Sequence, residues 1–434
     1  MSESSGVLPF DIIALIIDIV GEKKDINLLK ELALVSHSFL HICNKHLFAS
    51  VELHDAIPIC HPASSKKGFV KLLKSRPGVV KYIRKLTYKV GNLSPAANGR
   101  DYLRFSQLPE YDDHLLSPIL PNLLRTISRL NCLTITGSKL DWNTLDSSLT
   151  SAFLHLMHLP TINHIDLSFI QNFPLSSLAL SVSLHRLDIF HLSHSNPLEE
   201  DDSPEIDVQS EMMPKIREFH TSGSTLLTTK LLYAKMQDGR PTFNFTNLRR
   251  FSMSFTYLED ERNIRYLLQN AKLLEKLHLS VGFDRSLVGL HDILSPSART
   301  LKVLDLTVYL YDDSVPLRLA GLCEELEAME GHYMLESLSF EIQVDGHETE
   351  DLVGSTIQKV EKVLVKPGWS LLRQISFKVS IACCQVSSEE SAELCEVLQS
   401  LPDKYLYHLP KLESVAFSYS AYVAECSYVV KYDF

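Results

Sequence analysis

The chain has 434 residues, 45% of them hydrophobic and 22% charged, which is enough for one elongated core or several compact ones. A formal net charge of −11 argues against a general nucleic-acid binder, because such proteins carry a basic face. The eight cysteines form no Cys-x-x-Cys pair, so neither a disulfide framework nor a zinc ribbon is indicated. The absence of a long apolar stretch and of a basic leader predicts an intracellular protein, cytoplasmic or nuclear, with no membrane partner.

The first elements expected along the chain are three short apolar helices, separated by a polar break at Glu22–Asp25. They carry more apolar surface than three short helices can bury among themselves, so part of it is expected to face another protein. Ile12, Ile16 and Ile19 form one apolar stripe at helical spacing. A second apolar edge beside it is formed by Ile13 and Ile17.

The order of residues in this region resembles an F-box. An F-box opens with Leu-Pro, continues as an amphipathic helix, breaks at an acidic-polar turn and ends in a Val-Cys-Trp-like element. Here Leu8-Pro9 opens the segment and Leu34–Phe39 stands at its end. Ser36 and Phe39 replace the usual Cys and Trp, but Ser can cap the next helix and Phe can fill an aromatic slot.

The segment that leaves this region, His46–Phe48 followed by Val51–Leu53, is similar to the exit segment of a large fungal group of F-box proteins. The resemblance covers about residues 7–54. It implies that the helices dock on the Skp adaptor, and through it on cullin, while the rest of the chain holds a target protein near the ubiquitin-charged E2. By position, the adaptor-binding residues implied are Leu8, Pro9, Ile12, Ile16, Leu28, Leu32, Val35 and Phe39.

From Ile83 onward a six-residue pattern recurs, in which the first, fourth and sixth residues are apolar. The pattern alternates, so each copy predicts a short strand, and helical patterns such as Leu145–Leu159 and Leu258–Leu274 lie between copies. Such a unit cannot bury its apolar face alone, and stacked units give a curved parallel sheet with helices outside. The central apolar residues are Leu86, Leu133, Ile165, Leu187, Phe219, Phe251, Leu277, Leu304, Leu338, Ile375 and Val415.

This part of the chain is similar to an irregular leucine-rich-repeat array. The predicted fold class is therefore α/β, with a three-helix F-box followed by a leucine-rich-repeat-like solenoid. The expected domains are residues 1–54 (F-box), 55–78 (linker and entry helix) and 79–434 (solenoid). The array lacks the Asn or Cys that regular repeats carry five residues after each central position, which predicts uneven curvature.

Two segments interrupt the predicted array. Leu93–Pro121 contains proline and glycine and is expected to form an insertion. Asn196–Pro214 carries a run of acidic residues that cannot pack and is expected to form an exposed loop. A docking or phosphorylation segment is the functional alternative for this loop, although a solvated loop is the more frequent fate of such charge blocks.

The sequence contains no phosphate-binding loop, no zinc-protease helix motif and no serine-nucleophile elbow. His37 and His41 are spaced one helical turn apart, as metal ligands can be, but a single pair is more often a feature of a solvated helix. We therefore expect no catalytic residue, no metal and no cofactor, and a protein that is not an enzyme.

The residues that alternate with the buried ones along each strand point to the open face of the predicted sheet. They mix both signs of charge with short hydroxyls, which suits recognition of a specific protein. The sequence does not distinguish a ubiquitin-ligase subunit from a leucine-rich-repeat scaffold without ubiquitin transfer. The candidate target-binding residues are Arg186, Asp188, His220, Arg250, Lys276, His278 and Asp305.

Overall fold

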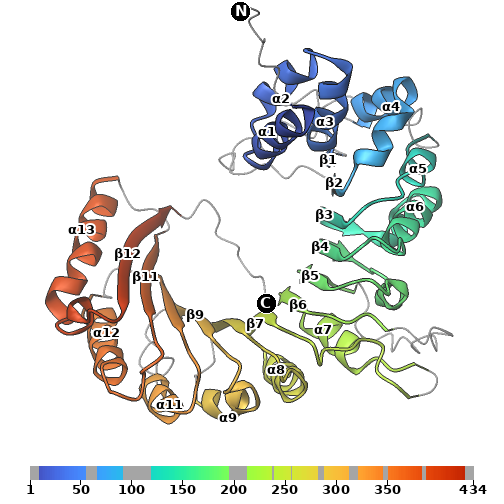
Figure 1. Cartoon of the computed structure of the whole chain (residues 1–434). Helices are drawn as coiled ribbons and strands as arrows, with labels where there is room; N and C mark the ends of the chain where they lie inside the picture. The colour runs from blue at the N-terminus through green and yellow to red at the C-terminus, as the bar shows by residue number, and fades with distance from the viewer. Residues whose placement is uncertain are drawn as a thin grey trace, which may run out of the picture. The chain divides into compact units, whose positions relative to one another are not determined.

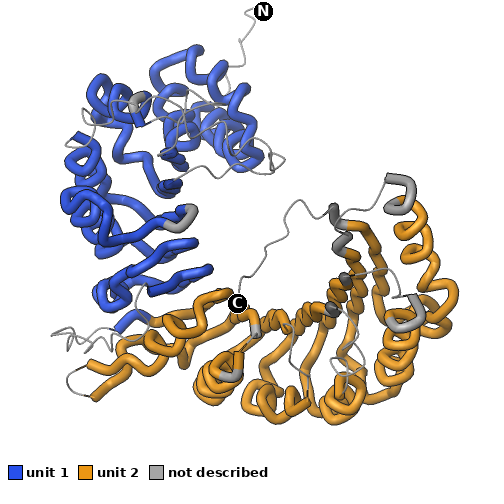
Figure 2. Tube along the Cα trace, turned by 180° about the vertical axis from the view of Figure 1, so that it is seen from behind, with its two compact units in different colours: residues 1–95, 104–214 blue, residues 96–103, 215–434 orange. Residues whose placement is uncertain are grey.

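The computed structural model of the chain is drawn in Figure 1. It describes residues 9–54, 66–90, 119–194, 213–236, 239–255, 257–281, 288–311, 321–345, 350–383 and 388–425. Leu8, residues 55–65 of the predicted linker, the insertion up to residue 118 and the acidic loop up to residue 212 lie outside these residues. The chain divides into two compact units (Figure 2), residues 1–95 with 104–214 and residues 96–103 with 215–434.

Unit 1 begins with three helices that share a small core. Ile17, Leu29 and Cys43 are buried at its centre, one from each helix. The starts of the second and third helices are capped, because Asp25 accepts a hydrogen bond from the Leu28 amide and Ser36 accepts one from the Phe39 amide. The predicted capping role of Ser36 is thus confirmed. The helices are α1 (Phe10–Glu22), α2 (Ile26–Ala33) and α3 (His37–Leu47).

The rest of unit 1 alternates strands with helical segments. Strands β1 to β5 pair in parallel and in chain order, so each strand lies beside its sequence neighbours. The strands are β1 (Ser50–His54), β2 (Lys85–Val90), β3 (Cys132–Asp141), β4 (His164–Gln171) and β5 (Arg186–Phe190). The helical segments are α4 (Lys66–Ser75), η2 (Pro77–Tyr82), α5 (Ile119–Leu124), η5 (Trp142–Thr144), α6 (Ser147–Met157) and η6 (Leu175–Leu180).

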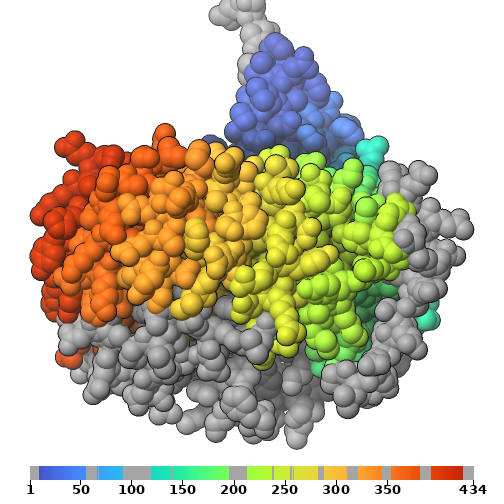
Figure 3. Space-filling view, turned by 90° about the horizontal axis from the view of Figure 1, so that it is seen from below, coloured from blue at the N-terminus to red at the C-terminus, as the bar shows by residue number. Residues whose placement is uncertain are grey.

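Unit 2 repeats the same plan. Its strands pair in parallel from β6 to β12, and its helices lie along one face of the sheet (Figure 1). In the space-filling view of Figure 3, the colours of unit 2 follow one another in chain order from yellow-green to red. The strands are β6 (Glu218–Ser222), β7 (Arg250–Phe255), β8 (Lys276–Val281), β9 (Val303–Tyr311), β10 (Ser337–Asp345), β11 (Gln374–Cys383) and β12 (Ala416–Glu425). The helical segments are α7 (Thr225–Tyr233), α8 (Leu258–Asn270), α9 (Leu290–Leu294), η7 (Ser295–Ser297), α11 (Leu322–Met329), α12 (Glu350–Leu364), α13 (Ser388–Tyr405) and η9 (Leu409–Lys411).

The central apolar residues of the predicted repeats lie side by side. In unit 1, Leu86, Leu133, Ile165 and Leu187 are direct partners on adjacent strands, and all four are buried. In unit 2 the same holds for Phe219, Phe251, Leu277, Leu304, Leu338 and Ile375. The α/β class and the parallel, leucine-rich-repeat-like sheet that the hexads predict are therefore confirmed.

Two predicted boundaries differ from the structure. Strand β1 lies within the segment assigned to the F-box, yet it pairs with β2, where Val51 lies opposite Leu86. The sheet therefore starts one strand earlier than predicted. In the last repeat Val415 precedes the strand, and Phe417 is the partner of Ile375. Both residues are apolar and two positions apart, so alternation alone did not fix the register.

None of the described helices combines the length and the apolarity that are needed to cross a bilayer.

Candidate functional site

Exposed apolar side chains concentrate on the N-terminal helices. Nine of the twenty-one large exposed apolar residues in the described part of the chain fall between residues 10 and 35. Leu34 is 88% exposed, in the turn between α2 and α3. Single exposed apolar residues are normal, but a group of this density marks an interaction surface. We call it the N-terminal apolar surface; it consists of Phe10, Ile12, Leu15, Ile16, Ile19, Ile26, Leu28, Leu34 and Val35.

Helix α1 divides its isoleucines between two faces. Ile17 is buried and Ile13 packs against the same core, whereas Ile12, Ile16 and Ile19 are exposed. The two edges expected from the sequence are thus an inner and an outer face of one helix, as a 3.6-residue repeat requires.

Of the predicted adaptor-binding residues, five are exposed. They are Pro9, Ile12, Ile16, Leu28 and Val35. Leu32 and Phe39 are half-buried and pack against the helical core, so their first role is to hold the three helices together. Leu8 lies outside the described residues. Leu15 and Leu34 were not predicted, although both belong to the same apolar runs.

A polar contact fixes α1 against α3. Asp18 accepts hydrogen bonds from His46, at 2.6 Å, and from Lys45, at 3.1 Å. The bond with His46, followed by that with Lys45, holds the pKa of Asp18 below its usual value despite the opposing effect of burial. A side chain at Gly21 would collide with the His46 ring, so glycine is needed where the two helices approach.

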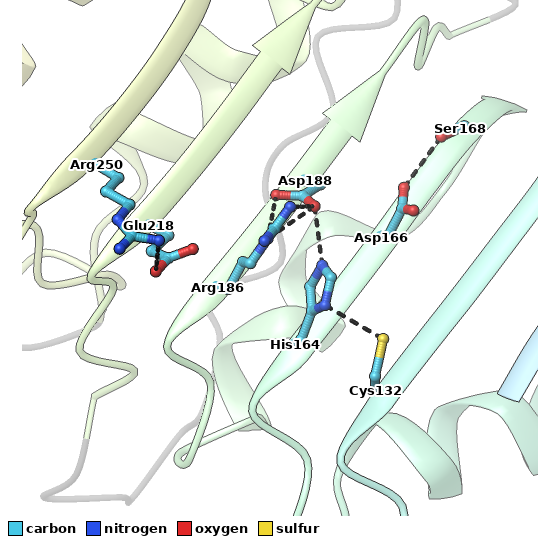
Figure 4. A network of polar contacts seen from close by, with 8 residues as sticks. All are labelled: Cys132, His164, Asp166, Ser168, Arg186, Asp188, Glu218 and Arg250. Carbon is cyan, nitrogen blue, oxygen red and sulfur yellow. Dashed lines mark hydrogen bonds and ion pairs between the residues drawn. The ribbon is translucent and has the colours of Figure 1, made fainter. Parts of the chain in front are cut away.

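The second candidate site lies on the open face of the unit 1 sheet (Figure 4). Cys132, His164 and Arg186 are direct partners on β3, β4 and β5. The Cys132 sulfur is 3.2 Å from His164 Nδ1, and His164 Nε2 is 2.8 Å from an Asp188 carboxylate oxygen. The Arg186 guanidinium donates to both oxygens of the same carboxylate, at 2.9 to 3.2 Å. We call Cys132, His164 and Asp188 the Cys132 cluster.

Burial and charge shape the titration of this face. Burial disfavours the protonated form of His164, but its hydrogen bonds with Asp188 and Cys132 outweigh burial and raise its pKa to about 9. Asp166, beside His164 on β4, has its pKa raised by burial and by the charge of Asp188, although Ser168 donates to it at 3.1 Å. The carboxyl groups of Asp166 and Asp188 therefore differ in their partners: Asp188 accepts from His164 and Arg186, whereas Asp166 accepts from Ser168.

The structure corrects two expectations on unit 1. Asp188 was a candidate target contact, but it is 4% exposed and both its oxygens are engaged by Arg186 and His164. Asp188 therefore holds the side chains of Arg186 and His164 in place and is not available to contact a target protein. The second concerns reactive groups: no catalytic residue was predicted, yet Cys132, His164 and Asp188 converge on this face. Aligning the hexad of β3 with those of β4 and β5 would have found Cys132.

An aromatic pair lies near the ends of β4 and β5. Phe169 has φ +58° and His191 has φ +49°, and their rings stack at 4.8 Å. Along β4, Ser168 and Ile170 pair with β3, and Phe169 lies between them at a register shift. Its positive φ interrupts the alternation, so that Ile170 is buried and Phe169 is 44% exposed. Strain of this kind persists where the surroundings impose it.

The open face of unit 2 carries paired charges. Arg250 contacts Glu218 at 3.2 Å, and Lys276 contacts Asp305 at 2.8 Å. These four residues lie on β6, β7, β8 and β9, and the Glu218–Arg250 pair is seen in Figure 4. Arg250 and Lys276 remain partly exposed. Each ion pair can therefore open at small cost in free energy, and its residues can then contact a bound protein.

Histidines lie in the next row of the same face. His220, Ser252, His278 and Asp305 are partners on successive strands. Burial lowers the pKa of His278, and the nearby carboxylates of Asp305 and Glu341 oppose this shift. The structure therefore places His220, Arg250, Lys276, His278 and Asp305 on one surface, as predicted from the alternation, whereas Arg186 and Asp188 belong to unit 1.

His41 on α3 is paired with a tyrosine. His41 Nδ1 lies 2.6 Å from the Tyr82 hydroxyl, and across the described residues no group of three or more His, Cys, Asp or Glu side chains is arranged to hold a metal ion. The polar side chains described on the open faces of both sheets are instead joined by hydrogen bonds and ion pairs.

Comparison with known proteins finds no matching family model and no matching curated sequence. Among solved structures, the chain has a remote likeness to an internalin from Listeria monocytogenes, at 12% identity. The match covers 70% of this chain and 84% of the internalin, with a TM-score of 0.25. A likeness of this size carries no argument about function.

Proposed function

We propose that the protein is a substrate-recognition subunit of an SCF-type ubiquitin ligase. Its N-terminal helices bind the Skp adaptor, and its repeat sheet binds a target protein. The observation that carries the proposal is the N-terminal apolar surface, because its residues coincide with the segment that resembles an F-box. Five of the eight implied docking residues are exposed, and none of these five is needed for the helical core.

Apolar burial supplies the driving force for docking. A fully covered Leu or Ile side chain contributes about 1.5 to 3 kcal/mol, so exposed residues such as Ile16, Leu34 and Val35 supply a driving force for docking when a partner covers them. The helices beneath are held rigid by their shared core and by the contacts of Asp18. A rigid surface loses little entropy on binding.

The open faces of the sheets suit the binding of a target protein. They alternate positive, negative and hydroxyl side chains, which favours a partner with complementary charge rather than a lipid or a uniform polyanion. The protein itself catalyses no ubiquitin transfer in this proposal. It raises the concentration of the target near the ubiquitin-charged E2.

The test is co-expression of the full chain with the Skp adaptor, followed by size-exclusion chromatography. We expect a one-to-one complex for the natural chain. The variant Ile16→Asp with Val35→Asp should lose the adaptor, because it places two charges in the buried interface. Leu226→Asp is the matched control, since Leu226 is similarly exposed but lies on α7 of unit 2.

Ile16 and Val35 are both exposed, so circular dichroism should show that the double variant stays folded. Adaptor binding that survives the double substitution would overturn the docking surface. A natural chain that remains alone in solution would favour the alternative, a leucine-rich-repeat scaffold without ubiquitin transfer.

A further inference from the structure

The Cys132 cluster has the connectivity of an activated nucleophile. The thiol, the imidazole and the carboxylate come from three adjacent strands, and each lies within hydrogen-bond reach of the next, at 3.2 and 2.8 Å. A nucleophile, a base and a group that orients the base form the arrangement by which proteins activate thiols. None of these contacts is required by the hexad pattern, which specifies only the buried positions.

The buried carboxylate decides which nitrogen of His164 carries a proton. Ionised Asp188 only accepts hydrogen bonds, so His164 Nε2 must donate to it. In the neutral ring the other nitrogen, Nδ1, is then an acceptor, and it faces the Cys132 sulfur. The ring is therefore held in the tautomer that can take the thiol proton.

Charges around the cluster favour the ion pair that results. The hydrogen bonds of His164 with Asp188 and Cys132 raise the pKa of the imidazole to about 9 against the effect of burial. In the register of the sheet, Cys132 has Lys85 on β2 and His164 on β4 as its direct partners, and Arg186 on β5 is the partner of His164. The carboxyls on the same face are Asp166 and Asp188, one pair further along β4 and β5. Arg186 donates to Asp188 at 2.9 Å and so offsets part of the charge of that carboxylate.

We propose that Cys132 is a nucleophilic thiol and a site of covalent modification by small, uncharged soft electrophiles. His164 takes the thiol proton, and Asp188 positions His164. In the reaction the sulfur attacks an electrophilic carbon and a sulfur–carbon bond forms. The bond from that carbon to its leaving group breaks, the leaving group departs with the electron pair, and the proton remains on His164. This property is independent of adaptor and target binding.

Access distinguishes Cys132 from Cys43 but not from Cys323 and Cys395. Cys132 and His164 are half-buried on the open face, so a small reagent can reach the sulfur. Cys43 is buried in the helical core, and burial raises its pKa. Cys323 is half-buried like Cys132, but burial raises the pKa of its thiol as well. Cys323 and Cys395 therefore serve as internal comparators of similar exposure.

The experiment treats the full chain with iodoacetamide and follows each cysteine by peptide mass spectrometry between pH 6 and 8.5. At pH 6.5 we expect Cys132 to react about tenfold faster than Cys395 and Cys323. Its rate should change little with pH, whereas an ordinary thiol gains about tenfold per pH unit below its pKa. Equal rates for the three thiols, with the ordinary pH dependence at Cys132, would overturn the proposal.

A variant separates activation from mere exposure. His164→Gln should slow Cys132 to the rate of Cys395 and restore the ordinary pH dependence. His155→Gln is the matched control, because His155 is exposed on α6 of the same unit and should leave the rate unchanged. If His164→Gln does not fold, the pH profile of the natural chain decides the question alone.

Discussion

His164 and Asp188 are joined diagonally across two strands. The direct partner of His164 is Arg186 and that of Asp166 is Asp188, yet the 2.8 Å bond runs from His164 to Asp188, one rung further along. Two cationic groups thus share one buried carboxylate. Asp166 is the register partner of Asp188, and among the described residues no cation lies at hydrogen-bond distance from it. The behaviour of unit 1 toward pH and substitution follows from this asymmetry.

Unit 1 should lose stability in mildly alkaline solution. The pKa of His164 is about 9 in the folded chain and 6.5 in the unfolded chain. Because the folded value is the higher one, the stabilisation is fully present below pH 6.5 and is lost as pH rises through 9. We expect the free energy of unfolding to fall by about 2 to 3 kcal/mol across this range.

The two tryptophans allow unit 1 to be measured separately. Trp142 is buried in unit 1 and Trp369 in unit 2, so Trp369→Phe leaves fluorescence that reports on unit 1 alone. Urea unfolding at pH 6 and pH 9.5 in this background gives the change, and His164→Gln should remove most of it. A pH dependence that is the same with and without His164 would contradict the assignment.

Removing the charge of Asp188 and removing that of Asp166 should have different effects on the stability of unit 1. Asp188→Asn leaves Arg186 and His164 without their shared carboxylate, and we expect unit 1 to lose about 2 to 3 kcal/mol at pH 7. Asp166→Asn removes a carboxyl whose pKa is raised by burial and by Asp188, so it should be neutral or slightly stabilising. Urea unfolding read by Trp142 compares the two, and equal losses would refute the asymmetry.

The fold could be predicted largely because burial repeats along the sequence. A strand that buries alternate residues shows this alternation in its own sequence, whichever strands lie beside it. Ten of the eleven predicted central residues lie in the expected register of their unit. Val415 failed because Phe417 fits the pattern equally well, and pairing with β11 chooses between them. Strand β1 was missed because Val51–Leu53 was assigned to the exit segment of the F-box-like region.

The candidate sites were only partly predictable. The exposed side of α1 follows from helical spacing, but Leu32 and Phe39 have the same apolar character and turn inward because α2 and α3 pack there. The contact between Cys132 and His164 joins residues that are thirty-two positions apart. The aligned hexads of β3 and β4 place Cys132 opposite His164, but a hexad specifies the buried positions and not which polar side chains meet beside them.

Backbone strain at Phe169 predicts an unusual preference for glycine. At φ +58° any side chain is strained, so Phe169→Gly should leave unit 1 more stable than Phe169→Ala by about 1 kcal/mol. Both variants lose the stacking on His191, so that loss cancels in the comparison. Leu15 is the matched control, because it is exposed within α1 and there glycine should be the worse choice. Thermal unfolding of the four variants tests the reversal of sign.

In unit 2 a buried carboxylate holds the segment before the last strand. Glu361 on α12 is 1% exposed, and one of its oxygens accepts from the backbone amides of His408 and Leu409, at 2.7 and 2.9 Å. Glu361→Ala would leave both amides without their partner, and we expect a loss of about 2 to 3 kcal/mol in the unfolding of unit 2. Glu327→Ala is the control, since that residue pairs with Lys366 in solvent and should change little. Urea unfolding followed by Trp369 in a Trp142→Phe background measures both, and similar losses would show that Glu361 does not secure this segment.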